Sequence, residues 1–210
     1  MSDAPTLWQL EGPQFWGDYG DVLVAGLFDV PKRTNDTLNL MRTGPFVPPI
    51  AVIQAATVVV DAEFAHALRG AGFGLSFRPL NLTKVVRLDW EKWDRTASLP
   101  KVPPAGLEPE NYLMRRKHSP ETAAMLPPML EVVLRKGAYS ESHGPRLYNL
   151  ELLIDKGSWN GDAMFFVNPR GEDTPVIVSD DMKRWLEAHA PLWVTFKNVR
   201  SLAERQSEPS

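Results

Sequence analysis

The chain of 210 residues contains no cysteine. This absence excludes disulfide bonds, zinc sites built from thiolates and a cysteine nucleophile, and it is compatible with a reducing compartment. The fold must therefore rest on its hydrophobic core, and hydrophobic residues make up 43% of the chain. At this length they can form the core of one domain or of two small lobes packed together.

Neither sign of charge dominates the composition, and long apolar runs are missing. The net charge is -3 and the pI is near 5.8, whereas a nucleic-acid-binding domain is expected to carry a basic face. No window approaches the roughly 20 apolar residues that cross a bilayer. The first residues also lack the basic and apolar regions of a signal peptide. We therefore expect a soluble, cytoplasmic protein without a nucleic-acid or membrane partner.

Residues that carry chemistry are few and scattered. None of the four histidines stands three or four positions from another, and there is no Gly-x-Ser-x-Gly nucleophile motif. Ser142 and His143 are adjacent in a polar stretch, and a spatial triad with Asp155 stays open as an alternative. We predict no metal site, no cofactor and no catalytic residue.

Gly70, Gly72 and Gly74 form a Gly-x-Gly-x-Gly run. A phosphate-binding loop follows a strand and precedes a helix, whereas this run follows a predicted helix and precedes a predicted strand. Termination of that helix explains the glycines better.

Residues 176–200 indicate a strand, a helix and a second strand. Residues 176–178 are β-branched and apolar, and Ser179 is suited to cap the helix that follows. The helix carries residues at i, i+3, i+4 and i+7 that are expected to face inward, namely Met182, Trp185, Leu186 and His189. Pro191 ends the helix. The second strand alternates, with Leu192, Val194 and Phe196 on its inner face.

An earlier segment, residues 58–80, shows the same pattern. Asp61 occupies the capping position of Ser179, and the Phe-Arg pair at 77–78 corresponds to the Phe-Lys pair at 196–197. We predict a second strand-helix-strand unit here. Its likeness to the first has two explanations, an internal duplication or the pattern common to amphipathic units of this kind.

The remaining pattern favours an α+β fold with mixed, mostly antiparallel sheets, because strands outnumber helices and are only partly interleaved with them. Further strands are expected at 6–10, 22–28, 84–88 and 129–134, a helix at 111–118, a polar turn region at 136–145, and a hairpin formed by 147–154 and 163–167.

Proline marks the predicted division of the chain. Residues 98–109 hold four of the nineteen prolines and are expected to form a linker or a surface loop. This divides the chain into an N-terminal half, residues 1–97, and a C-terminal half, residues 110–203. Residues 204–210 are expected to form a flexible polar tail.

The segment from Val178 to Phe196, together with the Trp-Asn-Gly-Asp-Ala-Met-Phe run at 159–165, resembles the C-terminal signature of a large family of bacterial immunity proteins. That signature is a strand ending in Val-Ser-Asp, a short helix with an apolar stripe, and a strand closing on an aromatic residue. The resemblance implies a protein that binds and neutralises a polymorphic or secretion-delivered toxin. It covers about the last third of the chain and carries no catalytic residue.

Five residues are the candidate partner-binding positions. Trp159 lies in a polar turn beside Asp162. Trp193 is expected on the outer face of its strand, either covered by another element or exposed. Aromatic residues flanked by polar groups are typical of interface anchors. Arg115 and Arg116 belong to the strongest basic cluster, which would suit an acidic partner surface.

These observations favour binding over catalysis. The leading interpretation is an immunity protein whose partner is the C-terminal domain of a cognate toxin. The alternative is a small cytoplasmic hydrolase or transferase with a cleft between the two halves, and a third is a scaffold that self-associates through its aromatic surfaces.

Overall fold

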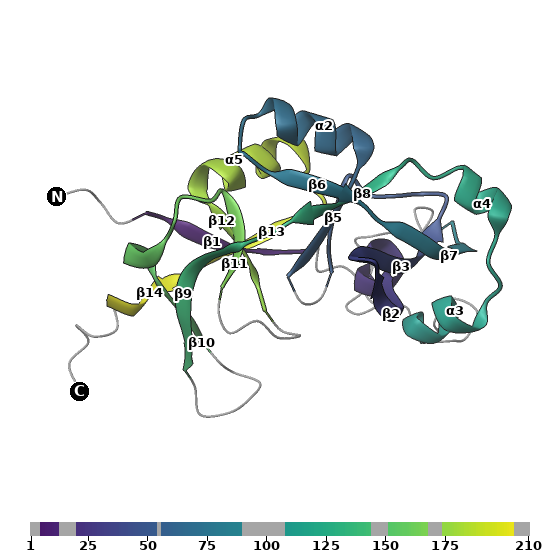
Figure 1. The fold of residues 1–210 in the computed structure, drawn as a ribbon, viewed down its shortest axis with the longest axis horizontal. Coiled ribbons are helices and arrows are strands. Elements are labelled where there is room, and N and C mark those ends of the chain that lie inside the picture. The colour runs from purple at the N-terminus through teal and green to yellow at the C-terminus, as the bar shows by residue number, and fades with distance from the viewer. Residues whose placement is uncertain are drawn as a thin grey trace.

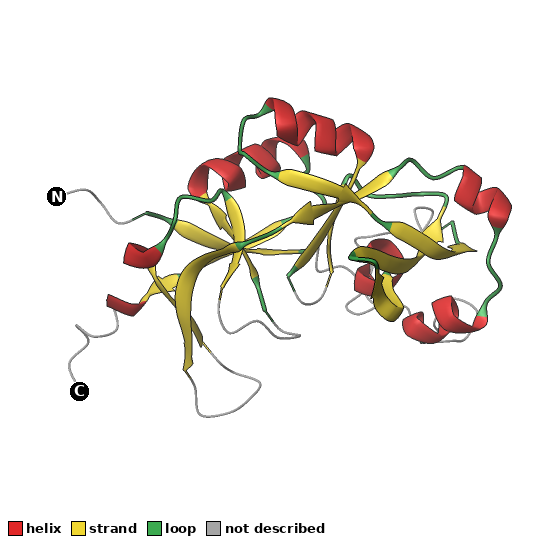
Figure 2. Cartoon of the chain, in the orientation of Figure 1, coloured by secondary structure: helices red, strands yellow, loops and turns green. Residues whose placement is uncertain are grey.

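The computed structural model describes residues 5–12, 20–53, 56–89, 108–143, 151–167 and 174–203. They form an α+β fold with sheets of seven, three and four strands, so the predicted fold class is confirmed (Figures 1 and 2). Residues 98–107 of the predicted linker and the predicted tail, 204–210, lie outside the described residues.

The elements follow one another in this order. The first half contains β1 (Leu7–Glu11), the π-helix η1 (Asp21–Ala25), β2 (Leu27–Thr34), β3 (Thr37–Gly44), β4 (Ile50–Ile53), β5 (Thr57–Asp61), α2 (Ala62–Gly70), β6 (Ser76–Pro79) and β7 (Asn81–Arg87). The second contains α3 (Pro109–Arg115), α4 (Pro120–Ala124), β8 (Met129–Val133), β9 (Lys136–His143), β10 (Glu151–Asp155), the 3-10 helix η4 (Lys156–Ser158), β11 (Met164–Val167), β12 (Val176–Ser179), α5 (Asp180–His189), β13 (Thr195–Asn198) and β14 (Arg200–Ser201).

Both predicted strand-helix-strand units are present, as β5-α2-β6 and β12-α5-β13. The Asp61 carboxylate accepts a hydrogen bond from the Phe64 N–H, and the Ser179 hydroxyl accepts one from the Met182 N–H. Each side chain thereby satisfies one of the N–H groups left unpaired at a helix start. The two helices begin at the predicted residues because the same capping chemistry starts both.

The sheets around the two units have the same strand order. The four-stranded sheet runs β4-β5-β8-β6, and part of the seven-stranded sheet runs β11-β12-β1-β13, with every neighbouring pair antiparallel. In each case a hairpin leads into the helix, and a strand from elsewhere in the chain lies between the two strands that flank the helix. This inserted strand is β8 in the first unit and β1 in the second.

The correspondence extends to the register at the helix caps. Asp61 pairs with Met129, the first residue of β8, and Ser179 pairs with Leu7, the first residue of β1. The caps therefore stand at the same place relative to the inserted strand in both sheets.

The closing strands β6 and β13 share this register. Phe77 pairs with Val132 and Phe196 pairs with Leu10, each three residues after the start of the inserted strand. The Phe-Arg and Phe-Lys pairs noted in the sequence are thus structurally equivalent, which supports an internal duplication.

The inserted strands cross the predicted division of the chain. The strand β1 belongs to the N-terminal half but completes the sheet of the second unit, and β8 belongs to the C-terminal half but completes the sheet of the first. The division at residues 98–109 stays a prediction, and each half supplies a strand to the sheet of the other.

Residues 136–143 form strand β9 rather than the predicted polar turn region. This strand pairs with β10 on one side and with β11 on the other, so β10 and β11 do not form the predicted hairpin. The polar sequence misled the prediction because β9 alternates irregularly, with Gly137 and Ala138 both buried and Tyr139 exposed. The strand predicted at 22–28 is also wrong in part, since η1 occupies residues 21–25 and β2 begins only at Leu27.

The largest hydrophobic cluster among the described residues joins the two units. Trp185 of α5 packs against Phe64 of α2 and Phe73, with ring centroids 5.3 and 6.1 Å apart. Met182 and Leu186 of the predicted stripe are fully buried. His189, which was also expected to face inward, is exposed, and its ring stacks on Trp185 with the centroids 4.0 Å apart.

The three-stranded sheet β2-β3-β7 carries a fully buried arginine, Arg42. Its guanidinium donates to the main-chain oxygens of Thr43, Val24 and Phe46 at 2.9, 3.1 and 3.4 Å, and it lies 3.0 Å from the Met129 sulfur. Arg42 therefore links η1, β3 and the start of β8.

Candidate functional site

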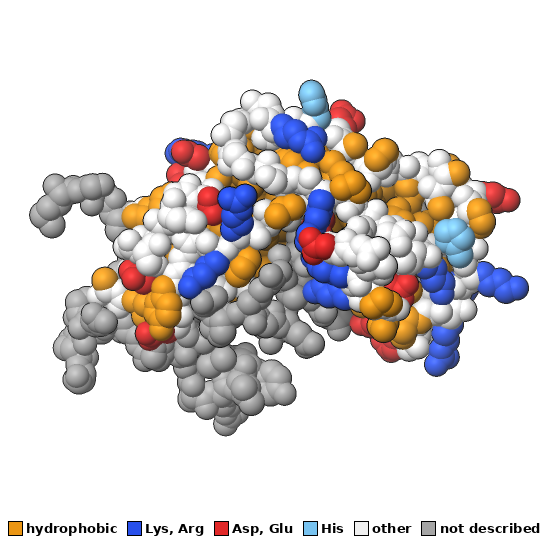
Figure 3. All heavy atoms as spheres, viewed as in Figure 1, with side chains coloured by type: hydrophobic (Ala, Val, Ile, Leu, Met, Phe, Trp, Pro, Cys, Tyr) orange, Lys and Arg blue, Asp and Glu red, His pale blue; other side chains and the backbone are white. Residues whose placement is uncertain are grey.

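The five predicted binding residues do not form one site. Arg115 is the last residue of α3 and Arg116 follows it, and Figure 1 places α3 at the opposite end of the molecule from β9 and β10. Both arginines are exposed, and the Arg116 guanidinium lies 4.9 Å from the centre of the Tyr112 ring. Basic side chains gather at this end of the molecule, near α3 (Figure 3).

Trp193 is not available to a partner, contrary to the prediction. Its exposed fraction is 8%, and its ring packs against Phe46 with the centroids 5.6 Å apart. The prediction was wrong because residues 191–193 form a turn and β13 begins only at Thr195. The turn exchanges the exposure expected for residues 192 and 193 alone, leaving Leu192 61% exposed.

Trp159 and Asp162 lie together in the 155–162 loop, which connects β10 with β11. The Trp159 indole N–H donates to the main-chain oxygen of Asp162 at 3.0 Å, and the ring packs against the second hydrophobic cluster, half-buried. Asn160 donates to the Asp162 carboxylate at 3.0 Å and accepts from the Asp162 N–H at 3.0 Å. Contacts within the loop thus hold both predicted residues in place.

The same loop is tied to strand β9. The Ser158 hydroxyl accepts from the Tyr139 N–H at 2.8 Å and donates to the main-chain oxygen of Asp155 at 2.7 Å. The Asn160 N–H donates to the main-chain oxygen of Gly137 at 2.9 Å. These bonds hold the loop in one arrangement, so a partner that binds it does not have to order it first.

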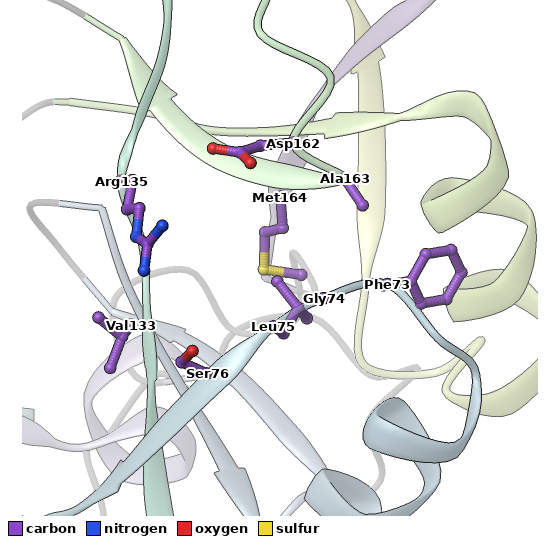
Figure 4. Close-up of a pocket in the computed structure, with 9 residues that line it drawn as sticks. All are labelled: Phe73, Gly74, Leu75, Ser76, Val133, Arg135, Asp162, Ala163 and Met164. Atoms are coloured by element: carbon purple, nitrogen blue, oxygen red, sulfur yellow. The ribbon is translucent and has the colours of Figure 1, made fainter.

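A small pocket opens beside this loop, between the two units (Figure 4). Its volume of about 40 Å³ is enough for about three water molecules. It is lined by Phe73, Gly74, Leu75, Ser76, Val133, Arg135, Asp162, Ala163 and Met164. Segments from three parts of the chain meet here, and Figure 4 shows the Arg135 side chain across the pocket from Met164, with the Asp162 carboxylate above.

Two exposed cations stand where the chain passes from β8 to β9. The side chains of Arg135 and Lys136 make no hydrogen bond or ion pair with any residue in the described parts of the chain. Tyr139, three residues further along β9, is 47% exposed. The surface around the 155–162 loop therefore combines a fixed carboxylate, two cations that pair with no described residue, and aromatic side chains.

The register of β9 and β10 separates the backbone positions of the serine triad that the sequence left open. Asp155 pairs with Tyr139, which lies three residues from Ser142 and four from His143. At about 3.4 Å per strand residue, this register places Asp155 roughly 10 Å from Ser142 along the sheet. The Asp155 carboxylate instead accepts from the Gly157 N–H at 3.0 Å.

Within the described residues, no group of three or more His, Asp or Glu side chains is placed to hold a metal ion. None of the helices there is long and apolar enough to cross a membrane. The chain matches no protein-family model, and a search of curated proteins found no similar sequence.

Arg135, Lys136, Tyr139 and Gly74 were not identified from the sequence. A lone arginine or lysine at a strand end has no distinctive spacing, and β9 was taken for a turn. Gly74 could have been found by comparing the two strand-helix-strand units. It stands two residues before β6, at the position that Trp193 occupies two residues before β13.

A second cluster of charges joins the β2-β3 hairpin to the first unit. The Glu131 carboxylate, 6% exposed, accepts from Arg33 at 3.0 Å and from Arg78 at 2.7 and 3.1 Å. Burial alone would raise the pKa of Glu131, but the hydrogen bonds and charges of the two arginines outweigh it and lower the pKa below its ordinary value of 4.5. Arg78 also pairs with the exposed Asp36 at 2.6 Å.

We expect Glu131→Gln to lower the free energy of unfolding at neutral pH by about 1–3 kcal/mol, because two arginines lose their shared carboxylate. The contribution of Glu131 is complete above its unfolded pKa and is lost as the pH falls through the lower folded pKa. Urea unfolding between about pH 3 and pH 7 should therefore show a gap between wild type and variant that closes at acid pH. Glu187→Gln, at a surface pair, is the control, and a gap independent of pH would contradict the assignment.

Proposed function

We propose that this protein is a cytoplasmic immunity protein that binds a cognate toxin domain and neutralises it by forming a complex. The proposal is carried by one observation. The 155–162 loop, whose residues 159–162 belong to the segment that resembles the immunity proteins, holds Trp159 and Asp162 in a fixed arrangement beside Arg135 and Lys136, whose side chains pair with no described residue.

Such a surface suits binding to another protein. Half-buried and exposed aromatic side chains supply contact area at a low entropic cost, and unpaired charges at the rim select a partner of complementary charge. Because the loop is already ordered by its own hydrogen bonds, less of the interaction energy is spent on ordering it. Arg135 and Lys136 favour an acidic surface on the toxin.

The pocket between the two units is too small to be the substrate cleft of the alternative, a hydrolase or transferase. Small-molecule sites are usually clefts of roughly 300–1,000 Å³. The pocket at Arg135 measures about 40 Å³, which suits a single side chain better than a whole substrate.

The test is protection of cells that express the toxin domain encoded beside this chain. We expect the wild type to restore growth and Arg135→Glu/Lys136→Glu to weaken binding of the purified domain by about 100-fold, because two favourable charge contacts become repulsive. Arg115→Glu/Arg116→Glu changes the same charges at the other end of the molecule and is the matched control.

The outcomes separate the function from the surface. If a folded, expressed wild type neither protects nor binds, the proposed function is wrong. If protection is lost in Arg115→Glu/Arg116→Glu and retained in the other variant, the toxin binds at α3 instead.

A further inference from the structure

We propose that the pocket beside Gly74 receives the edge of an aromatic side chain, tryptophan or tyrosine, from the partner protein. The inference rests on the proposed function and specifies how the partner is recognised. It follows from comparing the two strand-helix-strand units position by position.

The register of the two sheets places Gly74 opposite Trp193 in this comparison. Ser76 pairs with Val133, four residues after the start of β8, and Thr195 pairs with Glu11, four residues after the start of β1. Ser76 and Thr195 are therefore equivalent. Counting back two residues from each gives Gly74 in the first unit and Trp193 in the second.

In the second unit, Trp193 fills the equivalent space. It is 8% exposed and packs against Phe46. The hydrogen bonds of the helix caps show which residues correspond on the facing segments. The main-chain oxygen of Pro49 accepts from the N–H of the cap residue Asp61, and the main-chain oxygen of Ala163 accepts from the N–H of the cap residue Ser179, so Pro49 and Ala163 are equivalent. Phe46 precedes Pro49 by three residues.

Asn160, in the 155–162 loop, precedes Ala163 by three residues, so it is the equivalent of Phe46. The segment that meets Trp193 in one unit therefore corresponds to the segment that borders the pocket in the other. Where one unit holds an aromatic pair, the other has glycine and asparagine.

The first unit leaves this position open. A Cβ added at Gly74 would meet no atom within 4 Å, and the pocket lies beside it. Leu75, Val133 and Met164 supply the apolar part of its lining, and polar atoms supply most of the rest (Figure 4). The space that Trp193 occupies in the second unit is thus partly apolar and accessible from outside in the first.

The polar groups around the pocket define the side chain that it suits. The Arg135 guanidinium, which pairs with no residue in the described ranges, can lie against the face of an aromatic ring, where cation-π attraction favours tryptophan and tyrosine. The Asp162 carboxylate can accept a hydrogen bond from an indole N–H or a phenol O–H. An aliphatic side chain would satisfy neither group.

The pocket can be tested without the toxin. The full-length protein, labelled with ¹⁵N, is titrated with N-acetyl-tryptophanamide, and N-acetyl-leucinamide serves as the non-aromatic control. We expect saturable shifts of the Gly74, Ser76 and Ala163 amide signals with a dissociation constant on the order of 1 mM for the aromatic probe alone. Equal shifts with both probes, or no saturable shifts up to about 10 mM of the aromatic probe, would overturn the inference.

Arg135→Ala isolates the role of the cation. The side chain is exposed and pairs with no described residue, so its removal should leave the melting temperature unchanged. The affinity for the aromatic probe should fall by about 3- to 30-fold. Arg115→Ala, at the distant end, should bind the probe as the wild type does. If Arg135→Ala binds the aromatic probe as tightly as the wild type does, Arg135 does not contribute to the site.

The two proposals fail in different ways. A protein that protects cells but binds no aromatic probe has the proposed function without this pocket contact. A protein that binds the probe at Gly74 but neither protects against nor binds the toxin domain has the pocket without the proposed function.

Discussion

Replacing Arg42 with methionine is expected to lower the free energy of unfolding by about 3–5 kcal/mol, because the guanidinium is the donor to three main-chain oxygens in a place without solvent. Methionine keeps much of the side-chain volume but leaves the oxygens of Val24, Thr43 and Phe46 without that donor. Burial lowers the pKa of Arg42 to about 9, which still leaves it protonated at neutral pH. Its charge is therefore balanced in part by these carbonyl dipoles.

Urea unfolding followed by tryptophan fluorescence measures this effect. Arg42→Lys retains the charge but not the planar fork that reaches several oxygens at once, so we expect an intermediate loss. Arg115→Ala, in which an exposed arginine is removed, should change the unfolding free energy by less than about 0.5 kcal/mol. An Arg42→Met protein as stable as the Arg115→Ala control would show that the three carbonyl contacts contribute nothing.

Gly137→Ala is expected to cost about 1–3 kcal/mol or more, because it places a methyl group where a buried ring already lies. A Cβ at Gly137 would lie 2.3 Å from the Cγ atom of Phe165, whose side chain is fully buried. To relieve this overlap, either the buried ring has to repack or β9 has to shift away from β11. The 155–162 loop is bonded to Gly137 and should lose amide protection with it.

Gly70→Ala is the matched control for this substitution. Gly70 ends α2, and a Cβ there would meet no atom within 4 Å. Alanine is favoured over glycine in a helix, so we expect a gain of about 0.5–1 kcal/mol in unfolding free energy. If both variants are equally stable in thermal unfolding and in hydrogen exchange, the close packing of Phe165 on Gly137 does not limit stability.

The parts of the fold that were predicted correctly depend on local chemistry. Asp61 and Ser179 start their helices through bonds to residues three positions away, and the apolar spacing of α2 and α5 is visible within a single helix. Those signals are complete within about 25 residues of chain. The Phe-Arg and Phe-Lys pairs take the same register against β8 and β1, because each pair follows its helix cap by nearly the same number of residues.

The strands that were missed or misplaced depend on distant partners. Nothing in residues 7–11 indicates that they pair with β12, because Leu7 meets Ser179 only in the folded sheet. In β9, polar residues and a glycine hide a strand whose two neighbours come from later in the chain. The prediction of a β10-β11 hairpin failed for the same reason, since sequence proximity favoured a pairing that β9 prevents.

The candidate site divides in the same way. Trp159 and Asp162 were predicted together because they are three residues apart, and the loop does hold them together. Trp193 was assigned to the wrong side of its strand because a turn extends to that residue. Arg135 reaches the surface of the 155–162 loop only through the passage from β8 to β9, which no local pattern indicates.

The exchange of β1 and β8 between the sheets also governs how the chain can fold while it is being made. The ribosome releases β4, β5, α2 and β6 well before β8, so the first sheet lacks its interior strand until residues 129–133 emerge. The strand β1 must wait still longer, because its partners begin at Val176 and Thr195. Neither sheet can be completed early, and the two units are expected to become stable together only when most of the chain has left the exit tunnel.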